Sequence, residues 1–189
     1  MLSGKKAIVT GGARGIGLAI TRELIKNGAK VVICSRTPKE LKKAAKELNA
    51  AKRNVYDFVA DVSDKVDCNK LIDFSKRVLG GIDILVNNAG IYGPIGPLEE
   101  NDLDLWSKTI QINLLGTVYL SKSVIPIMKK SGRGKIINLC GSGVGGPKSL
   151  PRFSAYFSSK IAIAGFTESL AAELKNHNIQ VNCVSPGGV

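Results

Sequence analysis

A tyrosine and a lysine stand four residues apart in the segment Tyr156-Phe157-Ser158-Ser159-Lys160. On a helix this spacing places both side chains on one face, one turn apart. A fixed positive charge beside a phenol favours the phenolate, so the pair predicts a tyrosine that exchanges a proton near neutral pH. At about 5 Å and an effective dielectric near 20, the effect is roughly 3 kcal/mol, or about two pKa units. An ordinary amphipathic helix with a surface lysine would contain the same two residues, so the rest of the chain must decide.

A glycine-rich turn near the N-terminus is the second chemical feature. An apolar run at 5–10 predicts a strand, and residues 18–25 predict an amphipathic helix. Between them lies Gly11-Gly12-Ala13-Arg14-Gly15-Ile16-Gly17. Glycines allow a sharp turn and leave unpaired amides at the helix N-terminus, which suits a pyrophosphate. The alternative is a tight strand–helix connection without a ligand.

The elements that must position these features alternate regularly. Strands are expected near 5–10, 30–34, 55–59, 82–87, 134–140 and 179–185, with helices between them. One helix is expected to begin at the capping box Thr37-Pro38-Lys39-Glu40, and another at Ser63. Alternation of strands and helices implies right-handed crossovers and an α/β, Rossmann-type doubly wound parallel sheet of order 3-2-1-4-5-6, with helices on both faces.

Several short motifs occur in a fixed order along the chain. They are Thr10-Gly11-x-x-x-Gly15-x-Gly17, Asp61-Val62, Asn87-Asn88-Ala89-Gly90, Asn113, Tyr156-x-x-x-Lys160 and Pro186-Gly187. In this set the chain resembles the short-chain dehydrogenase/reductase family, in its common single-domain form, over essentially its whole length. The resemblance implies one dinucleotide-binding and catalytic domain over residues 1–189 and an oxidoreductase that interconverts a carbonyl and an alcohol with NAD(P).

The end of the second expected strand indicates which dinucleotide is preferred. An acidic residue there would favour NAD, whereas basic residues accommodate a 2′-phosphate. Here the strand leads into Ser35-Arg36 without a carboxylate, and Arg14 lies in the glycine turn. Two guanidiniums can form charge-assisted bonds to a phosphate, so the sequence predicts NADP(H) in preference to NAD(H).

The resemblance assigns further cofactor contacts by position. It implies that Asp61 meets the adenine edge, that the next side chain packs on the ring, and that Val189 offers backbone groups to the carboxamide. The Asn87-Asn88-Ala89-Gly90 motif is either part of the cofactor site or a structural strand end. The complete predicted cofactor set is Gly11, Arg14, Gly15, Ile16, Gly17, Ser35, Arg36, Asp61, Val62, Asn88, Ala89, Gly90, Tyr156, Lys160, Pro186, Gly187 and Val189.

The resemblance also implies the catalytic roles. Tyr156 would protonate the carbonyl oxygen, Lys160 would stabilise the phenolate and hold the nicotinamide ribose, and Asn113 would bind a water in a proton relay. The family serine departs from its pattern, because Gly141 occupies the usual position and Ser142 follows it. Either Ser142 fills the role from a loop with an extra residue, or the third catalytic member is displaced.

Composition limits the other classes of function. The chain has 189 residues, a formal net charge of +12 and four scattered cysteines without metal-ligand spacing. We therefore expect no metal site, no membrane span and reduced thiols in a cytoplasmic protein. The basic residues are spread along helices without an aromatic-interleaved patch, so a nucleic-acid-binding protein is the weakest alternative.

The chain stops at Val189, whereas complete family members continue into a substrate-covering segment, a helix and a seventh strand. The expectation is that this segment is absent or belongs to a longer parent, so a nucleotide-binding or regulatory module without turnover stays open as the second hypothesis. The long helices near 101–129 and 154–175 resemble those that pair in family oligomers, which predicts a homodimer or homotetramer acting on a small carbonyl or alcohol.

Overall fold

The computed structural model describes residues 2–50, 54–141 and 150–187. Six strands form one sheet: β1 (Lys6–Thr10), β2 (Lys30–Ser35), β3 (Val55–Val59), β4 (Ile84–Asn87), β5 (Gly134–Leu139) and β6 (Ile179–Val184). The longer helices are α1 (Gly15–Lys26), α2 (Pro38–Leu48), α3 (Lys65–Leu79), α4 (Leu103–Ile110), α5 (Gly116–Ser131) and α6 (Ser154–Leu174). Short turns are η1 (Leu98–Glu100), η2 (Gln111–Leu115) and η3 (Lys175–His177), of which η2 is a π-helix.

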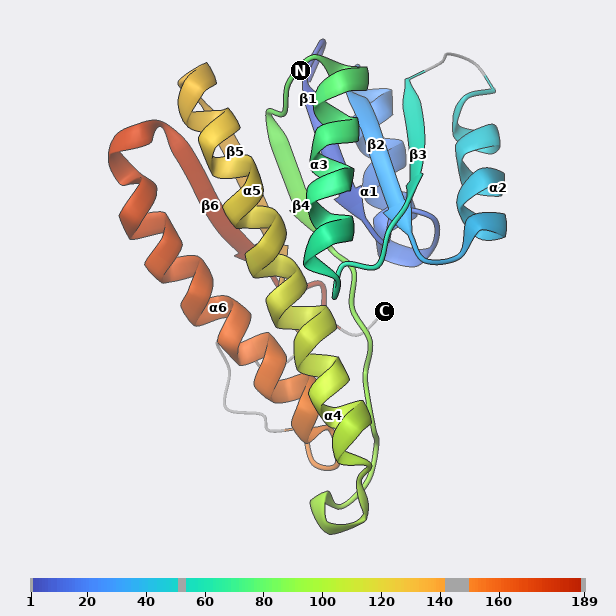
Figure 1. Cartoon of the computed structure of the whole chain (residues 1–189), viewed down its shortest axis with the longest axis vertical. Helices are drawn as coiled ribbons and strands as arrows, with labels where there is room; N and C mark the ends of the chain where they lie inside the picture. The colour runs from blue at the N-terminus through green and yellow to red at the C-terminus, as the bar shows by residue number, and fades with distance from the viewer. Residues whose placement is uncertain (1, 51–53, 142–149, 188–189) are drawn as a thin grey trace.

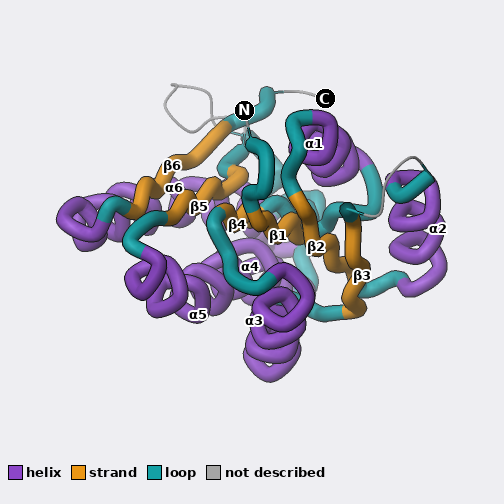
Figure 2. Tube along the Cα trace, turned by 90° about the horizontal axis from the view of Figure 1, so that it is seen from above, coloured by secondary structure: helices purple, strands orange, loops and turns teal. Residues whose placement is uncertain are grey.

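The strands are all parallel and lie in the order β3-β2-β1-β4-β5-β6. Helices cover both faces of this sheet, with α1 and α2 on one side and α3, α4 and α5 on the other (Figure 1, Figure 2). The doubly wound fold and the strand order expected from the sequence are thus confirmed. The order reverses between β1 and β4, and such a switch point opens a crevice at the carboxyl ends of the strands.

Alternating side chains on the central strands build two separate cores. Ile8 of β1 packs in the cluster beneath α3, α5 and α6, whereas its neighbours Ala7 and Val9 pack in the cluster beneath α1 and α2. Successive side chains of a strand point to opposite faces, so a sheet covered on both sides needs the near-continuous apolar runs that these strands have.

The helix that carries the candidate catalytic asparagine is interrupted at its centre. Helices α4 and α5 are joined end to end by the π-turn η2, which contains Asn113. In Figure 1 this long rod extends beyond the edge of the sheet, next to α6. A π-turn widens the helix locally, and such turns often re-aim a functional side chain.

Two helix starts differ from the expectation in detail. Helix α2 begins at Pro38 as expected, but the Thr37 side chain makes no capping hydrogen bond, so the capping box does not form. Helix α3 begins at Lys65 and not at Ser63, because the Asp64 carboxylate caps it by accepting from the amides of Val66 and Asp67. The Ser63 side chain is thereby available for another contact.

Candidate active site

A cavity of about 770 Å³ lies at the carboxyl edge of the sheet and extends over the switch point between β1 and β4. Its wall contains all the predicted cofactor residues that the structure describes: Gly11, Arg14, Gly15, Ile16, Gly17, Ser35, Arg36, Asp61, Val62, Asn88, Ala89, Gly90, Tyr156, Lys160, Pro186 and Gly187. Two predicted residues, Ser142 and Val189, lie outside the described residues. Asn113 is described but is not among the lining residues.

The glycine turn between β1 and α1 has the backbone that a phosphate site needs. Gly11 and Gly15 have backbone φ angles of +63° and +51°, which residues other than glycine rarely adopt. A Cβ on Gly15 would meet nothing within 4 Å, so the turn presents open space to the cavity. Helix α1 has no side-chain cap and no acidic residue in its first turn among the described residues. Its first amides and the positive end of its dipole therefore favour an anion.

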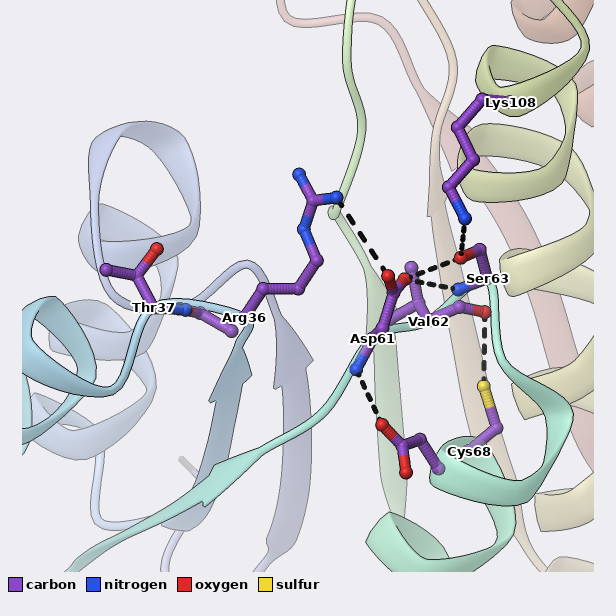
Figure 3. A network of polar contacts seen from close by, with 9 residues as sticks. Arg36, Thr37, Asp61, Val62, Ser63, Cys68 and Lys108 are labelled. Carbon is purple, nitrogen blue, oxygen red and sulfur yellow. Dashed lines mark hydrogen bonds and ion pairs between the residues drawn. The ribbon is translucent and has the colours of Figure 1, made fainter. Parts of the chain in front are cut away.

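At the other side of this turn a network of charged and polar groups borders the cavity (Figure 3). The Arg36 guanidinium lies 3.9 Å from the Asp61 carboxylate, and both side chains line the cavity. Both Arg36 and Arg14 are exposed. Two cations at this end of the cavity are suited to a phosphate ester, whose charge-assisted hydrogen bonds are stronger than those of neutral pairs.

The Asn88 side chain joins the ends of two strands. Its amide nitrogen donates to the carbonyl oxygen of Thr10 at 2.8 Å, and its backbone amide donates to the Thr10 hydroxyl at 3.0 Å. The amide of Ala89 donates to the same hydroxyl at 2.9 Å. These bonds hold the carboxyl ends of β1 and β4 together, so this motif has a structural task while its backbone lines the cavity.

Tyr156 and Lys160 both line the cavity and lie together, as their spacing on α6 predicts. The Lys160 ammonium lies 5.6 Å from the centre of the Tyr156 ring and donates to the carbonyl oxygen of Leu139 at 2.7 Å. It is therefore held over the ring and the end of β5. Burial lowers the pKa of Lys160 to about 8, against a small opposing effect of Cys140.

The expected fall in the pKa of Tyr156 is wrong: in the folded chain this pKa is raised. Burial, followed by the neighbouring Tyr92 and Cys140, raises the pKa of the Tyr156 phenol above its ordinary value. An ammonium acting alone beside an exposed phenol would lower the pKa of that phenol, whereas Lys160 is 5% exposed and its own charge is disfavoured. In this state the pair favours a neutral phenol, which is a proton donor.

Gly141 lies directly against the Tyr156 hydroxyl. A Cβ on Gly141 would fall 2.9 Å from both the Tyr156 oxygen and Cγ of Lys160. Position 141, where the family pattern has a serine, is thus beside the phenol and has no hydroxyl in this chain. Cys140 also lines the cavity, and burial with a hydrogen bond from Cys183 raises the pKa of its thiol to about 11, so it stays protonated.

Asn113 is fully buried and its side chain is used in three hydrogen bonds. Its carbonyl oxygen accepts from the amide of Ile91 at 2.9 Å, and its nitrogen donates to the Ile91 carbonyl and to the Ser159 hydroxyl, both at 2.9 Å. Ser159 in turn donates to the carbonyl of Tyr156 at 2.7 Å. The asparagine therefore holds the loop after β4 against α6, near Tyr156, and its part in a water relay stays a prediction.

Some residues at the site carry no signal in the sequence motifs. Tyr92 lines the cavity, is 60% exposed, and its ring centre lies 5.0 Å from that of Tyr156. Glu40, which the sequence suggested only as a helix cap, also lines the cavity. Lys108 donates to the Ser63 hydroxyl at 2.7 Å, and Ser63 donates to Asp61. Only tertiary packing brings these residues together, although the aromatic residue two positions after the Asn-Asn-Ala-Gly motif is a signal in the sequence.

The chain matches the family model for short chain dehydrogenase over residues 5–189. It is 38% identical to dehydrogenase/reductase SDR family member 4 of Rattus norvegicus over 98% of this chain and 66% of that protein. With the glycine turn, the switch-point cavity and the Tyr156–Lys160 pair in place, the chain belongs to the short-chain dehydrogenase/reductase family.

Solved structures agree with this assignment. The NAD⁺-bound xylitol dehydrogenase superposes with a TM-score of 0.93 at 32% identity, covering 98% of this chain and 71% of that one. A putative short-chain alcohol dehydrogenase from Sinorhizobium meliloti 1021 superposes with a TM-score of 0.91 at 35% identity, covering 98% and 73%. No helix in the described parts of the chain is long and apolar enough to cross a membrane.

Proposed function

We propose that the chain is the dinucleotide-binding and catalytic part of an NADP(H)-dependent oxidoreductase that interconverts a small carbonyl compound and its alcohol. One observation carries this proposal. A single cavity is lined both by the glycine turn with Arg14 and Arg36 and by Tyr156 and Lys160. A molecule that spans this cavity must present an anionic end to the first group and a reacting end to the second.

Several residues that line the cavity have the properties that such a cofactor requires. The open space at Gly15 and the uncapped N-terminus of α1 suit the pyrophosphate, and the small residues Ala89 and Gly90 leave room along the end of β4. When bound, the nicotinamide ring supplies or accepts the hydride.

The protein contributes the proton and the positions. Tyr156, neutral in this state, donates its proton to the carbonyl oxygen in the reductive direction and recovers it from solvent. Lys160 lies over the phenol ring, and its ammonium stabilises the phenolate that forms. The hydrogen bonds of Asn113 hold the loop after β4 against α6, so that the wall bearing Tyr92 stays beside Tyr156.

The preference for the phosphorylated cofactor rests on Arg14 and Arg36, both exposed at the same end of the cavity. NAD(H) is the alternative cofactor, because the similar xylitol dehydrogenase structure contains NAD⁺. Replacing Arg36 with alanine is expected to weaken NADPH binding by about tenfold and NADH binding by less than about twofold, since a charge-assisted bond contributes roughly 1.5–3 kcal/mol. Equal losses for both nucleotides would contradict the NADP(H) preference.

The activity is tested by following NADPH oxidation with a panel of small ketones. Turnover is expected to fall by about 10²–10⁴-fold in Tyr156→Phe, which removes the proton donor but keeps the ring. NADPH affinity, measured by nicotinamide fluorescence, should change by less than about threefold. A Phe variant that retains turnover would contradict the assigned acid.

A second candidate is a nucleotide-binding module without turnover. It is favoured by Gly141, which places no hydroxyl beside the Tyr156 phenol to bind the substrate oxygen. The chain also spans 66% of the length of its rat relative, and we therefore propose turnover for this chain and do not take it from that relative. NADPH binding without oxidation by any ketone of the panel would support this candidate.

The assembly and environment are part of the same proposal. Helices α5 and α6 lie on one side of the sheet, and α6 has apolar residues all round, with Ile161 43% exposed. We place a homodimer or homotetramer contact on these helices, which sedimentation would detect. Four free thiols, three of them buried, suit a reducing cytoplasm.

A further inference from the structure

The network in Figure 3 connects Asp61, which lines the cavity, to Lys108 of helix α4. Lys108 lies in α4, and its ammonium donates to the Ser63 hydroxyl at 2.7 Å, 45 residues away in the chain. The Ser63 hydroxyl has one proton, which it donates to Oδ1 of Asp61 at 2.7 Å. The backbone amide of Ser63 donates to the same oxygen at 2.9 Å.

These contacts orient the Asp61 carboxylate. Oδ1 accepts both hydrogen bonds from Ser63, and the backbone amide of Asp61 donates to the Asp67 carboxylate at 3.2 Å. Within the described chain, Oδ2 meets only the guanidinium of Arg36, at 3.9 Å, which is too long for a hydrogen bond. Oδ2 therefore keeps its accepting capacity, and Asp61 is one of the residues that line the cavity.

The charges keep this acceptor ionised. Burial disfavours the charge of Asp61, but the two Ser63 hydrogen bonds and then the cations Lys108 and Arg36 outweigh it, so the pKa of Asp61 is lowered. The Lys108 ammonium polarises the Ser63 hydroxyl and makes it a stronger donor to the carboxylate. An ionised carboxylate accepts hydrogen bonds and donates none.

The residues around Oδ2 of Asp61 determine which hydrogen-bond donor can reach this oxygen. Asp61 lines the cavity between the small apolar residues Ala60 and Val62, with Arg36 opposite. This wall suits the edge of a flat heteroaromatic ring that carries an amino donor. A ring with an oxo oxygen at the same place would bring two acceptors together, which is repulsive.

We infer that Lys108 is a positioning residue for the nucleobase, which through the Ser63 hydroxyl holds the Asp61 carboxylate to accept from the amino group of adenine. The inference rests on the proposed dinucleotide-binding function. It assigns Lys108 and Ser63 to the selection of an amino-purine over an oxo-purine, a property that is separate from hydride transfer and from the choice between NADP(H) and NAD(H).

The test compares the dissociation constants of NADPH and of its hypoxanthine analogue, in which the amino group is replaced by oxygen. Both are measured by nicotinamide fluorescence without a substrate. The wild-type chain is expected to bind NADPH about tenfold more tightly than the analogue. Lys108→Met should reduce this ratio to about threefold or less, and Ser63→Ala should do the same. Lys108→Arg, which keeps the charge and a donor, should restore most of the ratio.

Lys122→Met is the matched control, since it removes one exposed lysine from α5 and should leave the ratio unchanged. The double variant Ser63→Ala/Lys108→Met should lose no more than either single variant, because both interrupt one chain of contacts. Urea unfolding identifies any variant that fails to fold. If Lys108→Met does not fold, the ratio in Ser63→Ala is compared with that of the wild type.

The outcomes separate the two proposals. If the wild-type chain binds neither nucleotide, the proposed function fails and this inference with it. If it binds both but Lys108→Met and Ser63→Ala weaken them by one common factor, or leave the ratio at its wild-type value, the inference alone is overturned.

Discussion

Tyr156 and Lys160 show how burial changes the meaning of a spacing. The lysine is 5% exposed and donates to the carbonyl of Leu139, so its charge lies in a place that disfavours it. A group of this kind costs folding stability, and chains keep such groups where chemistry requires them. The depressed pKa of the lysine is therefore a property of the folded site that stability measurements can detect.

The stability of the chain should depend on pH through Lys160. Its pKa is about 8 in the folded protein and 10.5 for a free lysine side chain. Between these values the unfolded chain holds a proton that the folded chain has lost, so stability rises with pH. Below pH 8 both states are protonated and the penalty is constant. Urea unfolding of the wild type, relative to Lys160→Met, should show a difference that rises toward pH 10.5, by up to about 1.4 kcal/mol per pH unit.

Lys122→Met is the control for this comparison, because that lysine is exposed. Its stability difference from the wild type should stay flat over the same pH range. Parallel curves for Lys160→Met and the wild type would mean that the ammonium is hydrated in the folded protein, contrary to its burial.

At the residue scale, sequence patterns predict features formed by neighbouring residues but not contacts between residues that are distant in the sequence. The Tyr-x-x-x-Lys spacing and the glycine turn are short-range features, and both line the cavity as expected. The direction of the pKa of Tyr156 depends on Tyr92 and on burial, which no spacing encodes. The contact between Lys108 and Ser63 joins residues 45 apart, and Ser63 itself was assigned to a helix start that Asp64 supplies.

At the element scale, the apolar runs placed the strands closely. The run expected near 30–34 is β2 (Lys30–Ser35), and the one near 55–59 is β3 (Val55–Val59). Parallel strands covered on both faces are apolar throughout, so their sequence signal is strong. The π-turn η2 was not foreseen, because an extra residue in a helical turn leaves the apolar pattern of α4 and α5 nearly unchanged.

The packing of α1 on the glycine turn gives a prediction at this scale. Gly17 lies inside α1, where an alanine would normally stabilise the helix by roughly 1 kcal/mol. A Cβ there would collide with the backbone oxygen of Gly11 and with the side-chain nitrogen of Asn88. The backbone of Gly11 can move only at a cost in free energy. Gly17→Ala should therefore lower the free energy of unfolding by about 1–3 kcal/mol and, because α1 shifts, weaken NADPH binding.

Gly165→Ala is the matched control for that variant. Gly165 also lies inside a helix, α6, and its Cβ would meet nothing within 4 Å, so this change should stabilise the chain slightly. Urea unfolding of both variants gives the comparison. A Gly17→Ala variant as stable as Gly165→Ala would show that α1 is not packed on the turn as closely as described.

At the scale of the whole molecule, the formal net charge of +12 acts on every anion that approaches. The positive field is not tied to one patch, but the cavity concentrates it, since Arg14 and Arg36 line it and so does the N-terminus of α1, the positive end of the helix dipole. A dinucleotide with an additional phosphate should be attracted more strongly than one without, before any contact forms. Electrostatic attraction of this kind acts chiefly on the rate of association.

The association rate of NADPH should therefore fall more steeply with salt than that of NADH. Between about 0.01 M and 0.15 M ionic strength the Debye length shrinks from about 30 Å to about 8 Å, which removes long-range attraction but spares contacts inside the cavity. Stopped-flow fluorescence of the nicotinamide gives both rates. Arg36→Ala removes one charge of many, so it should speed dissociation of NADPH while leaving most of the salt dependence of association. Equal salt slopes for the two nucleotides would show that the net charge is too dispersed to guide a ligand, and that any preference for NADPH arises only from contacts such as Arg36.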